Sequence, residues 1–84
     1  MNVMAELSLY PLTEQYIGPI KTFIERLHCY EGITVSTSST STQVSGDYAT
    51  VVRILGEEMQ RTHEEVGQAV FVAKFLNFDK MQQG

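Results

Sequence analysis

Residues 2–11 read NVMAELSLYP, and apolar side chains occupy every second position along this stretch. One side of the stretch carries only apolar residues, namely Val3, Ala5, Leu7 and Leu9. The other side is mixed and consists of Met4, Glu6, Ser8 and Tyr10. A period of two predicts a β-strand from Asn2 to Tyr10 with one buried face. We expect Pro11 to end this strand, because proline has no backbone N–H for a ladder hydrogen bond.

An amphipathic helix should follow the first strand. Apolar residues recur there at spacings of three and four, which is the period of one helix face: Ile17, Ile20, Phe23, Ile24 and Leu27. Pro19 falls in the first turn, where a missing N–H costs little. We expect the helix to end near Tyr30, with Gly32 in the turn that follows.

Two short strands joined by a hairpin are predicted next. Residues 33–38 are rich in β-branched side chains, and Ile33 and Val35 should face the core. Residues 41–45 form the partner strand, with Val44 pointing inward. The hydroxyl-rich segment 38–40 between them is typical of a hairpin connection.

Asp47 should open a second helix, because its carboxylate can accept backbone N–H groups of the first turn. The predicted inner face consists of Val51, Val52, Leu55, Met59 and Thr62. Gly56 in mid-helix should cost about 1 kcal/mol relative to alanine, which a close approach of the sheet or of another subunit would justify. Gly67 follows the predicted end of the helix, residues 70–76 read as the last strand, and residues 78–84 as a flexible C-terminal tail.

The order strand–helix–strand–strand–helix–strand predicts an α+β domain of the ferredoxin-like βαββαβ plan. Right-handed crossovers then give a four-stranded antiparallel sheet in the order 4-1-3-2, with two helices on one face. We expect residues 1–77 to form this single domain. The uncovered sheet face would carry Glu6, Ser8 and Tyr10 beside Gln43 and Ser45 or Ser41.

Charge and composition argue against two classes of partner, nucleic acids and membranes. The chain has 84 residues and a net charge of −4, and its six lysines and arginines are scattered. Nucleic-acid binding needs clustered cations, and a membrane span needs about 18 apolar residues in a row, so neither partner is expected. Cys29 is the only cysteine, which favours a reducing, cytoplasmic setting. A core this small favours a homo-oligomer, either a homodimer or a homotetramer.

The predicted topology gathers polar residues at one rim of the sheet. The end of the first strand (Ser8, Tyr10), the end of the second (Thr37) and the start of the third (Ser41, Thr42) should meet there. The free N–H groups at the start of the first helix open toward the same rim. This set suits a small polar heteroaromatic ligand. The alternative is that the hydroxyls serve only the hairpin and that Tyr10 only packs at a strand end.

Other residues are weaker candidates for a functional site. His28 and His63 lie on different helices with no convergent third ligand, so we expect no metal site. No nucleophile–base pair, phosphate loop or cofactor motif is present, so we expect neither a bound cofactor nor enzymatic activity. An acylphosphatase would need an arginine after the first strand, where residues 11–14 read PLTE. Glu6, central on the open sheet face, could pair with a cation across an interface or hold a ligand's amino group.

Two segments together carry a family resemblance. Residues 7–12, LSLYPL, and residues 41–48, STQVSGDY, resemble the signature segments S-x-Y-P-L and S-T-x-x-x-G-D/E of the small thiamine-binding (YkoF-like) family. The resemblance implies a non-catalytic, oligomeric or tandemly repeated ferredoxin-like domain that recognises thiamine or its hydroxymethylpyrimidine half. It assigns ligand contacts to Ser8, Tyr10, Ser41 and Thr42. The sequence departs from the family pattern at residues 37–40, TSST, where an Asn and a Met are frequent.

Two hypotheses of function follow. The first is a carrier or sensor of a thiamine-related pyrimidine in thiamine salvage or transport. Its candidate ligand-binding residues are Glu6, Ser8, Tyr10, Thr37, Ser41 and Thr42. The second is a ligand-free structural or regulatory oligomer that uses the same open sheet face for assembly.

Overall fold

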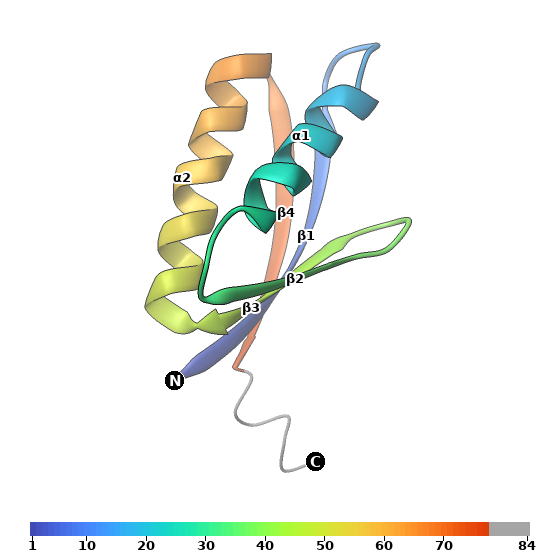
Figure 1. The fold of residues 1–84 in the computed structure, drawn as a ribbon. Helices are drawn as coiled ribbons and strands as arrows, with labels where there is room; N and C mark the ends of the chain where they lie inside the picture. Colours follow the sequence, from blue (N-terminus) through green and yellow to red (C-terminus); the bar gives the residue numbers. More distant parts are fainter. Residues whose placement is uncertain (78–84) are drawn as a thin grey trace.

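The computed structural model describes residues 1–77. Its elements follow the predicted order, shown in Figure 1: β1 (Asn2–Pro11), α1 (Ile17–His28), β2 (Ile33–Thr37), β3 (Thr42–Asp47), α2 (Tyr48–Val66) and β4 (Ala69–Asn77). The predicted tail, residues 78–84, lies outside the described residues. Within residues 1–77, no helix is both long and apolar enough to cross a membrane.

The strands form one four-stranded sheet in the order β2-β3-β1-β4, which is the predicted order 4-1-3-2 read from the opposite edge. Every pairing is antiparallel. Both helices lie on the same side of the sheet (Figure 1). The predicted ferredoxin-like α+β fold is therefore confirmed.

β1 does not end at Tyr10 as predicted but continues through Pro11, which stands opposite Ala69 of β4. The next residue confirms the pairing, because the Leu12 N–H donates to the Gln68 carbonyl at 3.1 Å. Alternate residues of a strand direct their backbone groups to opposite neighbours. The nitrogen of Pro11 therefore faces away from β4, and no hydrogen bond of that ladder is lost.

The hairpin strands are also shifted from the prediction. β2 ends at Thr37, and β3 begins at Thr42, because Ser38 and Ser41 close the turn through a 2.9 Å bond from the Ser38 N–H to the Ser41 carbonyl. β3 then runs beyond Ser45 to Asp47. It can do so because Gly46 adopts a φ of 156° at a point where a Cβ would stand 2.7 Å from the Gly32 carbonyl oxygen.

The core lies between the sheet and the two helices. Its buried members are Val3, Ala5, Leu7, Phe23, Leu27, Val44, Val51, Ile54 and Leu55. Val52 was predicted on the inner face of α2 and is 45% exposed, so that prediction is wrong. The buried line on α2 instead passes through Ile54 and Glu58, and Val52 lies about 100° around the helix from Val51.

Two of the α2 predictions concern backbone geometry. Asp47 caps the helix as predicted, accepting the Thr50 N–H at 3.2 Å. The hydrogen bonds from Thr50 hold the pKa of the Asp47 carboxyl below its ordinary value of 3.8. A Cβ added at Gly56 would meet nothing within 4 Å, so within the domain no close approach requires this glycine.

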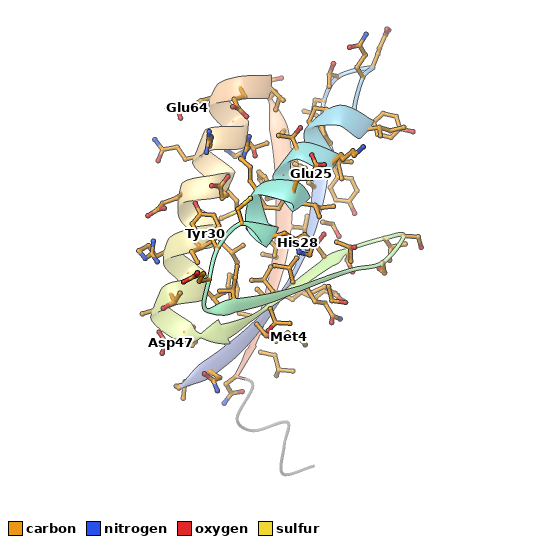
Figure 2. The ribbon with its side chains drawn as sticks, in the orientation of Figure 1. Met4, Glu25, His28, Tyr30, Asp47 and Glu64 are labelled. Carbon is orange, nitrogen blue, oxygen red and sulfur yellow. The ribbon has the colours of Figure 1, made fainter. Side chains whose placement is uncertain are left out.

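A buried carboxylate joins the two helices, which the sequence did not predict. Glu58 on α2 is 2% exposed. Its Oε1 accepts the Arg26 Nε–H of α1 at 2.7 Å, and its Oε2 accepts the Tyr30 hydroxyl at 2.6 Å. Figure 2 shows Tyr30 beside α2. The hydrogen bond to Glu58 raises the pKa of the Tyr30 hydroxyl above its ordinary value of 10.0.

Replacing Glu58 with alanine should lower the free energy of unfolding by about 2 kcal/mol or more, because Arg26 and Tyr30 would lose a shared partner in a place that water reaches poorly. The matched control is Glu57→Ala, which removes a 54% exposed side chain bonded to Arg53 at 3.4 Å. That change should cost less than about 0.5 kcal/mol. Urea unfolding curves compare the two, and equal losses would contradict the role given to Glu58.

Candidate functional site

The candidate site begins where one of the two neighbours of β1 ends its pairing with that strand. The β1–β3 ladder ends at Leu7 opposite Thr42, whereas β1 stays paired with β4 as far as Pro11. Beyond Leu7 the β2–β3 hairpin swings away from β1 (Figure 1). Within residues 1–77, no strand therefore pairs with the edge of β1 that faces away from β4 over residues 8–11.

A cavity of about 400 Å³ occupies this opening. Three parts of the chain line it: residues 7–10 of β1, one end and face of α1, and residues 38–42 of the hairpin. Because the contribution from β1 is continuous, the cavity meets side chains from both faces of the strand. It therefore reaches the strand edge as well as the space under α1.

The hairpin forms a wall of hydroxyl groups. The Ser38 hydroxyl accepts the N–H groups of Thr40 and Ser41 at 3.3 and 3.2 Å, which stiffens the turn. Ser8 on β1 reaches across the opening and donates its hydroxyl to the Thr40 carbonyl at 3.3 Å. Thr42 is 6% exposed, at the deep end of the wall. This wall can donate to or accept from a polar ligand.

The opposite wall is apolar and aromatic. Ile20, Phe23 and Ile24 line the cavity from α1. Phe23 is fixed from behind by the Phe71 ring of β4, with centroids 5.1 Å apart. Tyr10 and Tyr16 also line the cavity, and both are more than half exposed. A flat ring could lie between these surfaces.

The cavity is electrically neutral. Among the described residues, those that line it carry no charged side chain. Recognition there must therefore depend on hydrogen bonds, ring contacts and shape, and a charged group on a ligand would find no counter-charge in the lining.

The structure brings together four of the six predicted ligand-binding residues. Ser8, Tyr10, Ser41 and Thr42 all line the cavity. Thr37 lies outside it, at a smaller hollow of about 250 Å³ shared with Ser36 and Gln43.

Glu6 also lies outside the cavity. Its position comes before the point where β3 leaves β1, and it stands opposite Lys74 of β4 and Gln43 of β3. The Lys74 Nζ lies 3.7 Å from its Oε1. Glu6 thus has a cation of its own domain as a neighbour.

Sequence analysis placed the backbone N–H groups at the start of this helix at the rim, but it missed the side chains that α1 and the residue before it contribute. Tyr16 precedes the helix, and Ile20 and Ile24 were predicted only as members of its apolar face. A signal was present, because a tyrosine directly before a helix that starts at the predicted rim lies in reach of a ligand there. The helix has no side-chain cap at Tyr16.

Other places in the described residues are weaker candidates. A wider surface hollow of about 710 Å³ lies along α2 and β4, where His63 is already bonded to the Ala69 carbonyl at 3.0 Å. Within residues 1–77, no group of three or more His, Cys, Asp or Glu side chains could hold a metal ion. The cavity between β1, α1 and the hairpin is the best-built candidate site.

Comparison with known proteins supports the fold. The model of the YKOF-related family matches residues 2–77. No curated protein matches the sequence. Solved structures match the fold, beginning with a protein of Streptococcus pneumoniae that is 21% identical, with a TM-score of 0.84 and full coverage of both chains.

Two further structures are similar. One, from Thermotoga maritima, is provisionally assigned to thiamine biosynthesis or salvage; it is 13% identical, with a TM-score of 0.82 and coverage of 99% of this chain and 97% of that one. The other is a hypothetical protein of Methanocaldococcus jannascii, 22% identical, with a TM-score of 0.78 and coverage of 96% and 91%. At these identities the likeness establishes the fold.

Proposed function

This chain belongs to the YKOF-related family, and from that premise we propose that it binds thiamine or its hydroxymethylpyrimidine half without catalysing a reaction. The observation that carries the proposal is the cavity at the end of β1, which joins Ser8 and Tyr10 with Ser41 and Thr42. The thiamine assignment of the similar Thermotoga maritima protein points to the same ligand class. Such a protein would serve as a carrier or sensor in thiamine salvage or transport.

The chemistry of the ligand fits the two walls. A pyrimidine offers a flat π face, ring-nitrogen acceptors and an exocyclic amino donor. Contact with Tyr10 or Tyr16 would contribute about 0.5–1.5 kcal/mol beyond burial if the rings are offset or edge-on. Each hydroxyl of Ser8, Ser41 or Thr42 that pairs with the ring would contribute about 0.5–1.5 kcal/mol.

The double variant Ser41→Ala, Thr42→Val should bind hydroxymethylpyrimidine about tenfold or more weakly, because it removes two hydroxyls from the cavity wall while keeping the side-chain volume nearly constant. Isothermal titration calorimetry measures the loss. The matched control is Ser45→Ala, Thr34→Val, which makes the same chemical changes at a cross-strand pair outside the cavity. The control should bind as the parent does. The proposal would be wrong if the parent protein bound neither thiamine nor the pyrimidine.

Catalysis is not part of the proposal, because the described residues that line the cavity include no carboxylate, histidine, lysine or arginine to act with the hydroxyl groups as a base or a counter-charge. Incubation with thiamine or its phosphates should leave them unchanged when followed by chromatography. Turnover that persists through repurification and disappears in the Ser41→Ala, Thr42→Val variant would show that the protein is an enzyme.

A second candidate function is assembly, and a different observation favours it. The open face of the sheet carries a stripe of apolar side chains on β1 and β4: Met4, Val70, Val72 and Leu76. Three of these, Val70, Val72 and Leu76, are between 43% and 48% exposed. β4 is also an edge strand, which leaves backbone groups available to a neighbour. We propose that this face joins copies of the chain into a homodimer or homotetramer.

Light scattering should show a mass of two or four chains at micromolar concentration. Val72→Glu should shift the protein toward the monomer, because it places a charge in the apolar stripe. Val52→Glu is the matched control, since Val52 on α2 is 45% exposed and Val72 is 48% exposed. The control should keep the parent's mass. A monomeric parent would rule out assembly through this face.

A further inference from the structure

The backbone of β1 also presents hydrogen-bonding groups at the cavity, and the direction in which these groups point can be derived. Two bonds fix which residues face which neighbour. The Leu12 N–H donates to Gln68 on the β4 side, and the Tyr48 N–H donates to the Met1 carbonyl on the β3 side. Backbone groups alternate between neighbours along an antiparallel strand. The backbone N–H and C=O groups of even-numbered β1 residues therefore point toward β4, and those of odd-numbered residues point toward β3.

Leu9 is the residue that this alternation leaves facing the cavity. The ladder with β3 ends at Leu7, so in the described part of the chain no strand residue stands opposite Leu9 on that side. The next odd-numbered residue is Pro11, which has no N–H. At this edge Leu9 thus presents one N–H donor and one carbonyl acceptor, side by side and pointing the same way.

Three backbone groups of the hairpin across the opening already have hydrogen-bond partners. The Thr40 carbonyl accepts the Ser8 hydroxyl, and the N–H groups of Thr40 and Ser41 donate to the Ser38 hydroxyl. A ligand seated in the cavity is therefore the partner best placed to use the Leu9 peptide groups. Leu9 itself lines the cavity.

We propose that the Leu9 peptide edge selects the ligand, its N–H donating to a ring nitrogen and its carbonyl accepting from the amino group beside that nitrogen. The inference rests on the proposed function and deepens it. The ligand then takes the place of the missing β3 residue, as an added strand does at a sheet edge. A ring held in this plane turns one face toward Ile20 and Phe23 of α1, which line the same cavity.

The neutral lining adds a second element of selection. The 4-aminopyrimidine ring is neutral, whereas the thiazolium half of thiamine carries a fixed positive charge. With no charged side chain among the described residues of the lining, the cavity accommodates the ring, and the charged half stays at the mouth in water.

The first test compares hydroxymethylpyrimidine with its 4-oxo analogue. The analogue keeps the size and shape of the ring but carries N–H where the parent has an acceptor and a carbonyl where it has an amino donor. It should bind about tenfold or more weakly in calorimetric titrations, because both hydrogen bonds with Leu9 are reversed. Equal binding of the two compounds would overturn the inference while leaving the proposed function in place.

Amide hydrogen exchange followed by NMR measures directly whether the Leu9 N–H is hydrogen-bonded. Saturating hydroxymethylpyrimidine should slow exchange at Leu9 by about tenfold or more, since a hydrogen-bonded amide exchanges only when it opens. The amide of Ser8, which faces β4, is the internal control and should change little. Binding with no protection at Leu9 contradicts the inference, and absence of binding removes the proposed function together with it.

Two variants distinguish the contribution of the Leu9 backbone to ligand binding from that of its side chain. Leu9→Ala and Leu9→Pro both shorten the side chain, but only proline also removes the N–H, at a position where no ladder bond to β4 is lost. Leu9→Pro should bind hydroxymethylpyrimidine about tenfold or more weakly than Leu9→Ala. Equal affinities would overturn the inference. If the proline variant does not fold, the analogue and exchange measurements on the parent protein decide.

Discussion

β1 pairs with β4 from Val3 to Pro11 but with β3 only from Asn2 to Leu7, and the cavity exists because these two ladders differ in length. A strand that continues after its neighbour has left presents backbone groups that something else must cover. Here α1 covers the opening from one side, and the tip of the hairpin covers it from another. The candidate site is thus a product of the sheet's own geometry.

The position of α1 depends in turn on α2. The half of α1 near its C-terminus is held through Arg26, whose guanidinium bonds to Glu58, Thr62 and Glu65 of α2. Glu58 is nearly inaccessible to water, so breaking this network would strand a buried charge. The half of α1 near its N-terminus then lies over the opening, where Tyr16 and Ile20 line the cavity. Helix packing and site geometry are therefore coupled, although Glu58 is not itself part of the cavity.

Charge and apolar surface are distributed so that the two proposed roles use different parts of the molecule. The ion pair of Glu6 and Lys74 and the stripe around Val72 belong to the open sheet face. The cavity lies at the rim, with a neutral lining. Ser8 and Tyr10 connect them, because both line the cavity and stand opposite Val72 and Val70 on the open face. Assembly through that face would bring a neighbouring chain close to the mouth of the site.

The residue pattern alone predicted the elements, their order and the sheet topology, because periodicity within a segment determines which of its faces is buried. It also placed Ser8, Tyr10, Ser41 and Thr42 at one rim, since topology determines which strand ends meet. Only the tertiary structure decided where the β1–β3 ladder stops, that Glu58 is buried while Val52 is exposed, and that Leu9 offers its peptide groups to the cavity. These features depend on how one element bends away from another or packs against it. The residue pattern within a single segment does not determine contacts between different elements.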